Sequence, residues 1–245
     1  MHYSKAPISE AVIDLRADFL TQPTIEVLEA IASRIGDGLP LRQRVNSFAF
    51  NLAATESSPE LVGSTASSVL GVRLSSSEND RVLQLLRHGL AYSHLPPYSD
   101  WGTFTDGLKP LWDGFVAGCH VQSVNRIAVR YINRIPVPNG ADVDDYLALG
   151  ARIPDAVTKH IIGYFVQIVL PIPELGPQYR AVINTGVEPG VASNPAGLLL
   201  DIDVFCEGSF AVAGDEIWAV LERLHSKKNE IFEASITDRV REIIR

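Results

Sequence analysis

Apolar side chains and arginines recur at alternate positions along residues 124–136, and the rest of the chain can be arranged around this stretch. It is rich in β-branched residues, contains no glycine and ends at Pro136 and Pro138, which predicts a long β-strand. Side chains alternate between the two faces of a strand, so we expect one apolar face and one cationic face. The apolar face carries Ile127, Val129, Tyr131 and Ile135, and the cationic face carries Arg126, Arg130 and Arg134.

Similar patterns predict further elements on both sides of this strand. Alternation predicts strands at 10–19, 45–53, 69–75, 81–86, 91–95, 163–172, 179–185 and 198–206. Helical periodicity predicts helices at 25–35, 101–119, 142–149, 215–232 and 235–245. Segments 55–68 and 188–196 are rich in Ser, Gly and Pro and are expected to be loops, and Gly89 suggests a bulge in a strand that continues from 81 to 95.

The predicted elements follow the order β-α-β-β-β-α twice, with the break near residue 122. This order predicts an α+β fold of antiparallel sheets with helices on one face, in two pseudo-repeated halves at 1–122 and 123–245. The halves could form two sheets, or join edge to edge into one sheet as in TATA-binding-protein-like and helix-grip folds, an alternative that rests on analogy. The sequence leaves both arrangements open.

Composition narrows the function classes. Hydrophobic residues make up 46% of the chain and charged residues 20%, which is typical of a globular protein with a filled core. The net charge of −8 disfavours non-specific binding to nucleic acid or to an anionic membrane. Cys119 and Cys206 are far apart and form no metal-ligand spacing, and no apolar run is long enough to span a membrane. These features favour a cytoplasmic protein with reduced thiols.

The row of Arg126, Arg130 and Arg134, with Asn133 beside it, is the main candidate binding site. Guanidinium groups suit carboxylates, phosphates and acidic peptides. The alternative is cross-strand ion pairing with an acidic strand face such as that of Glu10, Asp14 and Asp18. We expect Arg126 and Arg130 to be structural, because the strand is central there, and Arg134 to be exposed and functional near the strand end.

Asp201 and Asp203 form an Asp-x-Asp pair on one strand face. Two carboxylates about 6.6 Å apart could hold Mg²⁺ or share a proton, as in a metal-dependent hydrolase or nuclease that uses a histidine from elsewhere in the fold. The alternative is that Asp201 and Asp203 form ion pairs with the arginines of the row. The histidines show no metal-ligand spacing, His225 is expected to be a hydrogen-bonded packing residue, and no phosphate-binding or nucleophile motif is present. The sequence therefore predicts no metal and no cofactor.

Four motifs, spread over nearly the whole chain, carry a family resemblance. They are Ala6-Pro-Ile-Ser-Glu-Ala-Val-Ile-Asp-Leu-Arg16, Arg130-Tyr-Ile-Asn-Arg-Ile-Pro136, Leu200-Asp-Ile-Asp203, and the set Leu224, His225, Phe232, Ile236 and Thr237. The chain resembles a sporadically distributed, uncharacterised bacterial protein family with a Pro-Ile-x-Glu-Ala-Val motif at the N-terminus. The resemblance implies a bacterial cytoplasmic protein, and its patchy distribution is similar to that of defence-associated genes. It implies no activity and no catalytic residue.

Together these features favour a non-catalytic binding or adaptor protein that uses its arginine-lined sheet face for an acidic protein or anionic ligand. Two alternatives stay open: a hydrolase or nuclease built on Asp201 and Asp203, and a nucleic-acid-binding saddle. The sequence does not fix the oligomeric state, and a homo-oligomer is among the options.

Overall fold

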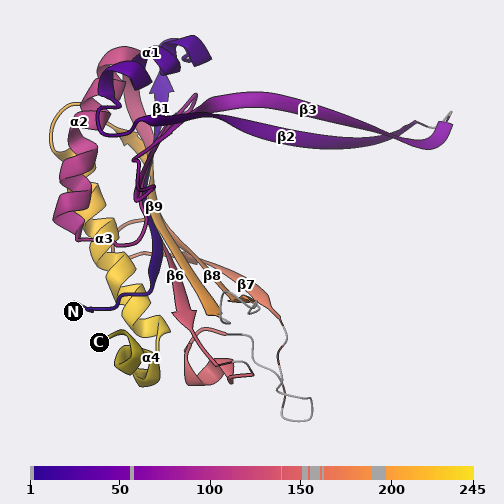
Figure 1. Ribbon diagram of the computed structural model, residues 1–245, viewed down its shortest axis with the longest axis vertical. Helices are drawn as coiled ribbons and strands as arrows, with labels where there is room; N and C mark the ends of the chain where they lie inside the picture. The colour runs from indigo at the N-terminus through magenta and orange to yellow at the C-terminus, as the bar shows by residue number, and fades with distance from the viewer. Residues whose placement is uncertain are drawn as a thin grey trace.

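The computed structural model describes residues 3–55, 58–138, 140–150, 154, 161, 163–188 and 197–245, with the backbone alone described at 47–55 and 58–67. These residues form a nine-stranded sheet in the order β2-β3-β4-β5-β1-β6-β9-β8-β7, in which all neighbours are antiparallel. Helices α1, α2 and α3 cover one face of this sheet (Figure 1). The predicted α+β class, with antiparallel strands and helices on one face, is confirmed.

The elements have the following bounds. The strands are β1 (Ile8–Phe19), β2 (Leu41–Thr55), β3 (Ser58–Ser75), β4 (Arg81–Leu86), β5 (Gly89–His94), β6 (Val121–Pro136), β7 (Phe165–Pro171), β8 (Tyr179–Glu188) and β9 (Gly197–Phe210). The helices are α1 (Ile25–Ile35), α2 (Trp101–Cys119), α3 (Glu216–Ser235) and α4 (Asp238–Ile244), with a short 3₁₀ turn η1 (Val143–Asp145). No helix in these described parts of the chain is long and apolar enough to cross a membrane.

Strands β1 and β6 form the middle of the sheet. Ile13 pairs with Val129 and Leu15 with Ile127, and all four side chains are fully buried under the helix layer. The apolar face predicted for β6 is therefore confirmed. Trp112 of α2 belongs to the same core.

Helices α1 and α2 pack closely against each other. A methyl group added at Gly118 would lie 2.5 Å from Ile31 Cγ1, and one at Gly114 would collide with Ile35. The small residues of this helix therefore serve close packing. Asp100 caps the N-terminus of helix α2, and its side chain accepts a hydrogen bond of 2.9 Å from the Thr103 N–H.

The two halves of the chain meet in one continuous sheet. The first contributes β2-β3-β4-β5-β1 and the second β6-β9-β8-β7, so in each half the first strand lies beside the last strand, and the halves join at β1 and β6. The expected element order was partly wrong, because four strands follow α1 and because residues 142–149 contain only the turn η1. The division at residue 122 and an internal duplication stay predictions.

Two local expectations are corrected. Residues 58–68 were expected to be a loop but belong to β3, which pairs with β2 along its length in a ribbon that projects from the sheet (Figure 1). Continuous pairing outweighs the weak strand propensity of Ser and Gly here. Gly89 marks no bulge. It begins β5 after a two-residue turn, with φ +151°, and a side chain there would collide with the Leu15 carbonyl oxygen. Of the expected loop 188–196, residues 189–196 lie outside the described residues.

Candidate functional site

Each arginine of the β6 row has a carboxylate partner. Arg126 donates hydrogen bonds of 2.8 Å to both Asp14 on β1 and Asp203 on β9. Arg130 donates from Nε and Nη2 to the two oxygens of Asp201, at 2.8 and 2.7 Å. The arginine row therefore forms the cross-strand ion pairs that were the alternative to a binding site.

Arg134 differs from its expected exposure. Its Nε donates to Glu188 Oε2 at 2.6 Å and its side chain is 22% exposed, whereas that of Arg130 is 46% exposed. Strands β8 and β9 extend alongside the end of β6, so Glu188 reaches Arg134. Arg130, not Arg134, is thus the more accessible member of the row.

Asn133 does not belong to the arginine face. Strand alternation turns it to the helix side with Tyr131, where it is buried and its Nδ2 donates to the Leu200 carbonyl oxygen at 3.0 Å. It lines the cavity described below. Placing it with the arginines was wrong for this geometric reason.

Asp201 and Asp203 meet the arginine row rather than a histidine. The Asp201 side chain is 4% exposed and accepts a further hydrogen bond of 2.9 Å from Asn184. Burial raises the pKa of Asp203, while the Arg126 guanidinium opposes this rise. Within the described residues, no group of three or more His, Cys, Asp or Glu side chains is placed to hold a metal ion.

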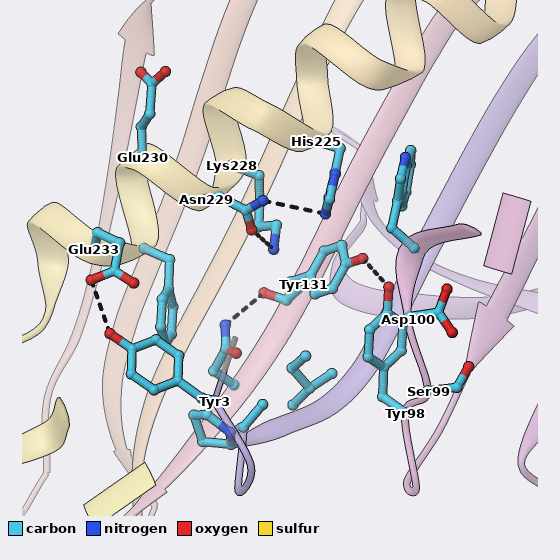
Figure 2. A pocket seen from close by; sticks show the side chains of 16 residues that line it. Tyr3, Tyr98, Ser99, Asp100, Tyr131, His225, Lys228, Asn229, Glu230 and Glu233 are labelled. Carbon is cyan, nitrogen blue, oxygen red and sulfur yellow. Dashed lines mark hydrogen bonds between the residues drawn. The ribbon is translucent and has the colours of Figure 1, made fainter. Parts of the chain in front are cut away.

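A cavity of about 500 Å³ lies on the opposite, helix-covered side of β6 (Figure 2). It is bounded by the chain start leading into β1, by β6, by the residues before α2 and by the C-terminal half of α3. Aromatic side chains make up much of its apolar wall, contributed by Tyr3, Tyr98, Trp101, Tyr131 and Phe232. Ligand sites are commonly concave, apolar and of this size, with a few polar groups.

Lys228 extends from α3 into this cavity and is only 7% exposed. Its Nζ lies 3.6 Å from the centroid of the Tyr131 ring and donates a hydrogen bond of 2.6 Å to Asn229 Oδ1. Among the described residues no carboxylate pairs with it. Burial therefore lowers the pKa of Lys228 to about 7, because the charged form loses hydration without gaining a counter-ion.

His225 lies one helical turn before Asn229 on the same wall. Its ring stacks on Trp101, with centroids 4.1 Å apart and planes within 7°, and Asn229 Nδ2 lies 3.3 Å from its Nε2. Because the amide nitrogen is the donor, this assigns the proton of the neutral imidazole to Nδ1. Burial lowers the pKa of His225 to about 4, so the ring is neutral near pH 7. The expected hydrogen-bonded packing histidine is confirmed, at the wall of a cavity.

Two phenol groups complete the polar lining. The hydroxyls of Tyr98 and Tyr131 are 2.7 Å apart, and either can be the donor (Figure 2). Burial raises the pKa of Tyr98 to about 12 and raises the pKa of Tyr131 well above its ordinary value. Both phenols therefore stay protonated and add polarity to the cavity without adding charge.

The acidic residues at the cavity edge are engaged elsewhere. Glu233 accepts from the Tyr3 hydroxyl at 3.1 Å and from Arg241 Nε at 3.3 Å. Glu230 pairs with Lys227 at 2.6 Å, and Asp100 caps α2. Among the described residues, Lys228 therefore has no acidic partner, whereas the carboxylates of Asp100, Glu230 and Glu233 are each engaged with another group.

Sequence reasoning did not find Lys228, although a signal was present. Leu221, Leu224 and Lys228 follow helical spacing on the buried face of α3, so a lysine occupies a position where an apolar residue is expected. A charged residue in an apolar stripe marks a candidate site, but the sequence alone could not show that a cavity lies there.

Comparison with known proteins finds no matching family model and no matching curated protein. The resemblance of the four sequence motifs to a bacterial family therefore stays a prediction.

Proposed function

We propose that this chain is a non-catalytic binding protein whose cavity beneath α3 takes a small aromatic carboxylic acid. The observation that supports this proposal most strongly is that Lys228 is buried beside aromatic side chains and has no acidic partner among the described residues. A ligand carboxylate would supply the missing counter-charge in a place of low dielectric, where a charge-assisted hydrogen bond is strong. An aromatic body would pack against Trp101, Tyr131 and Phe232.

The size of the site fits this ligand class. Cavities of roughly 300–1,000 Å³ bind compact organic molecules, and this one has about 500 Å³. Asn133, Tyr98 and Ser99 offer further hydrogen-bonding groups at the lining. These uncharged groups favour an acid with few other charges.

Calorimetric titration with 1-naphthoate tests this proposal. The free Lys228 has a pKa of about 7 and the bound carboxylate would raise it, so binding should take up a proton. We expect the association constant to fall by up to about tenfold per pH unit above pH 7. The titration should be run on Lys228→Met and, as a matched control, on Lys227→Met, whose lysine is already paired with Glu174 and Glu230.

Loss of binding in Lys228→Met with binding retained in Lys227→Met supports the proposal. Equal affinity of the wild type and Lys228→Met would contradict it, as would affinity that is independent of pH between 6 and 9. Near-ultraviolet circular dichroism of each variant establishes that the fold is intact.

A second candidate is docking of an acidic protein segment on the open face of the sheet. The observation that favours it is Arg130, which is 46% exposed and uses only Nε and Nη2 for Asp201. Poly-glutamate is a suitable probe, and binding that weakens with salt and is lost in Arg130→Ala supports this candidate. Binding unchanged in that variant would contradict it. The carboxylates interleaved with the row, Asp14, Asp201 and Asp203, favour this surface less for nucleic acid.

A further inference from the structure

The cavity that would bind carboxylates through the charged form of Lys228 also holds the uncharged amine. We propose that the Lys228 amine acts as a nucleophile toward small aromatic aldehydes and ketones that enter the cavity, forming a reversible imine. This inference rests on one part of the proposed function, namely that a small molecule can enter the cavity and reach Lys228.

The contacts of Lys228 suit a neutral amine. A neutral amine has two N–H groups and one lone pair. Asn229 Oδ1, 2.6 Å from Nζ, can accept one N–H, and the Tyr131 ring face, 3.6 Å away, can accept the other. Neither contact uses the lone pair, which is the group that attacks a carbonyl carbon.

Burial favours the neutral form of the amine, and no neighbouring carboxylate among the described residues is paired with it to offset this effect. Other titratable groups at the cavity are the neutral His225, the protonated phenols of Tyr3, Tyr98 and Tyr131, and the carboxylates of Asp100, Glu230 and Glu233. None of these carboxylates pairs with Lys228. With a pKa of about 7, a large share of the side chain is unprotonated at neutral pH.

Lys227 gives an internal contrast one residue away. Its Nζ pairs with Glu174 at 2.5 Å and Glu230 at 2.6 Å, and the Glu174 hydrogen bond raises its pKa. Lys227 therefore stays protonated at neutral pH and is a poor nucleophile. The two neighbouring lysines differ in burial and partners, not in intrinsic chemistry.

The step is balanced without an oxidant or reductant. The Lys228 nitrogen forms a bond to the carbonyl carbon, and a proton moves from nitrogen to the carbonyl oxygen to give a carbinolamine. The C–O bond then breaks as the second N–H proton is transferred to the departing hydroxyl group, so water leaves, the C=N bond forms, and amine and carbonyl compound become imine and water. The reverse reaction, addition of water, releases the ligand.

Trapping with 1-naphthaldehyde and sodium cyanoborohydride tests the inference on the full chain. Reduction fixes the imine as a naphthylmethyl group, and peptide mass mapping locates it. At pH 7.5 we expect labelling at Lys228 to be at least about tenfold faster than at Lys227, to saturate with aldehyde concentration and to be slowed by 1-naphthoate. Lys228→Met should lose this label and keep the slow labelling of Lys227.

The two proposals fail in different ways. If 1-naphthoate binds and depends on Lys228 but the aldehyde labels Lys228 no faster than Lys227, the imine inference is overturned and the binding function stands. If Lys228 is labelled selectively and saturably but 1-naphthoate neither binds nor competes, the imine inference stands and carboxylate binding is overturned. Labelling at Lys228 that rises linearly with aldehyde would also contradict the inference, because it would show no bound complex.

Discussion

The Nζ atom of Lys228 lies 3.6 Å from the centroid of the Tyr131 ring. The ring face attracts the ammonium electrostatically, by about 2 kcal/mol when both groups are desolvated. This is less than the cost of burying an unpaired ammonium, so the pKa of Lys228 still falls to about 7. Tyr131, on the core strand β6, therefore directly contacts the ionisable group of the cavity.

This burial predicts an unusual dependence of stability on pH. The ordinary pKa of lysine in an unfolded chain is about 10.4, and the folded value is about 7. Between these values the unfolded chain binds more protons, so the free energy of unfolding should rise with pH, by about 2 kcal/mol from pH 7 to 9. Urea unfolding of the wild type and Lys228→Met checks this, because the variant should lack the rise. Parallel curves would contradict it.

Removing Arg130 should destabilise the fold. Arg130→Ala leaves the Asp201 carboxylate, 4% exposed, with Asn184 as its remaining partner. We expect a loss of about 2–4 kcal/mol, reduced from the full cost of breaking a buried pair because Arg130 is half exposed. A second change, Asp201→Asn, should restore part of this loss.

A matched control for Arg130 is the exposed pair of Arg180 and Glu207 on β8 and β9. Arg180→Ala should cost less than about 1 kcal/mol. Equal losses for the two arginine variants in chemical unfolding would show that burial of the carboxylate does not matter.

The hydrogen bond between Tyr98 and Tyr131 should show coupling. Tyr98→Phe leaves the buried Tyr131 hydroxyl without its 2.7 Å partner and should cost about 1–2 kcal/mol. Changing both residues to Phe should cost less than the sum of the two single changes. Additive losses in a double-mutant cycle would mean that the pair contributes no interaction.

The central strand should be sensitive to loss of volume. Val129 is fully buried between β1 and β9, so Val129→Ala should lower the free energy of unfolding by about 1–3 kcal/mol. Val169→Ala on the edge strand β7 is the control, because Val169 is 56% exposed, and its effect should be below about 1 kcal/mol. A larger effect at Val169 would contradict the placement of the core.

The central strand was predictable because its pattern is local. Alternation along β6 is enough to place Ile127 and Val129 in the core and the arginines on the other face. Strand β3 was not predictable, because Ser and Gly at 58–68 are typical of loops and only pairing with β2 makes them a strand. The start of β5 at Gly89 likewise depends on its close approach to β1.

The site was less predictable than the fold. The partners of the arginine row come from β1, β8 and β9, and a sequence does not state which strands become neighbours. The alternation rule already placed Asn133 opposite the arginines, and sequence proximity was the wrong guide. The cavity depends on how α3 lies over β6, which only tertiary packing determines.

The seam between β1 and β6 has a consequence for how the chain folds during synthesis. Asp14 and Arg126, which join across it, are 112 positions apart. Until β6 leaves the ribosome, β1 has β5 on one side and an open row of amide and carbonyl groups on the other. Open strand edges are templates for pairing with other chains. A fragment that stops near residue 122 would keep this edge permanently open, so the first half should aggregate when it is made alone. In the full chain, β6 of the second half pairs with this edge and protects it.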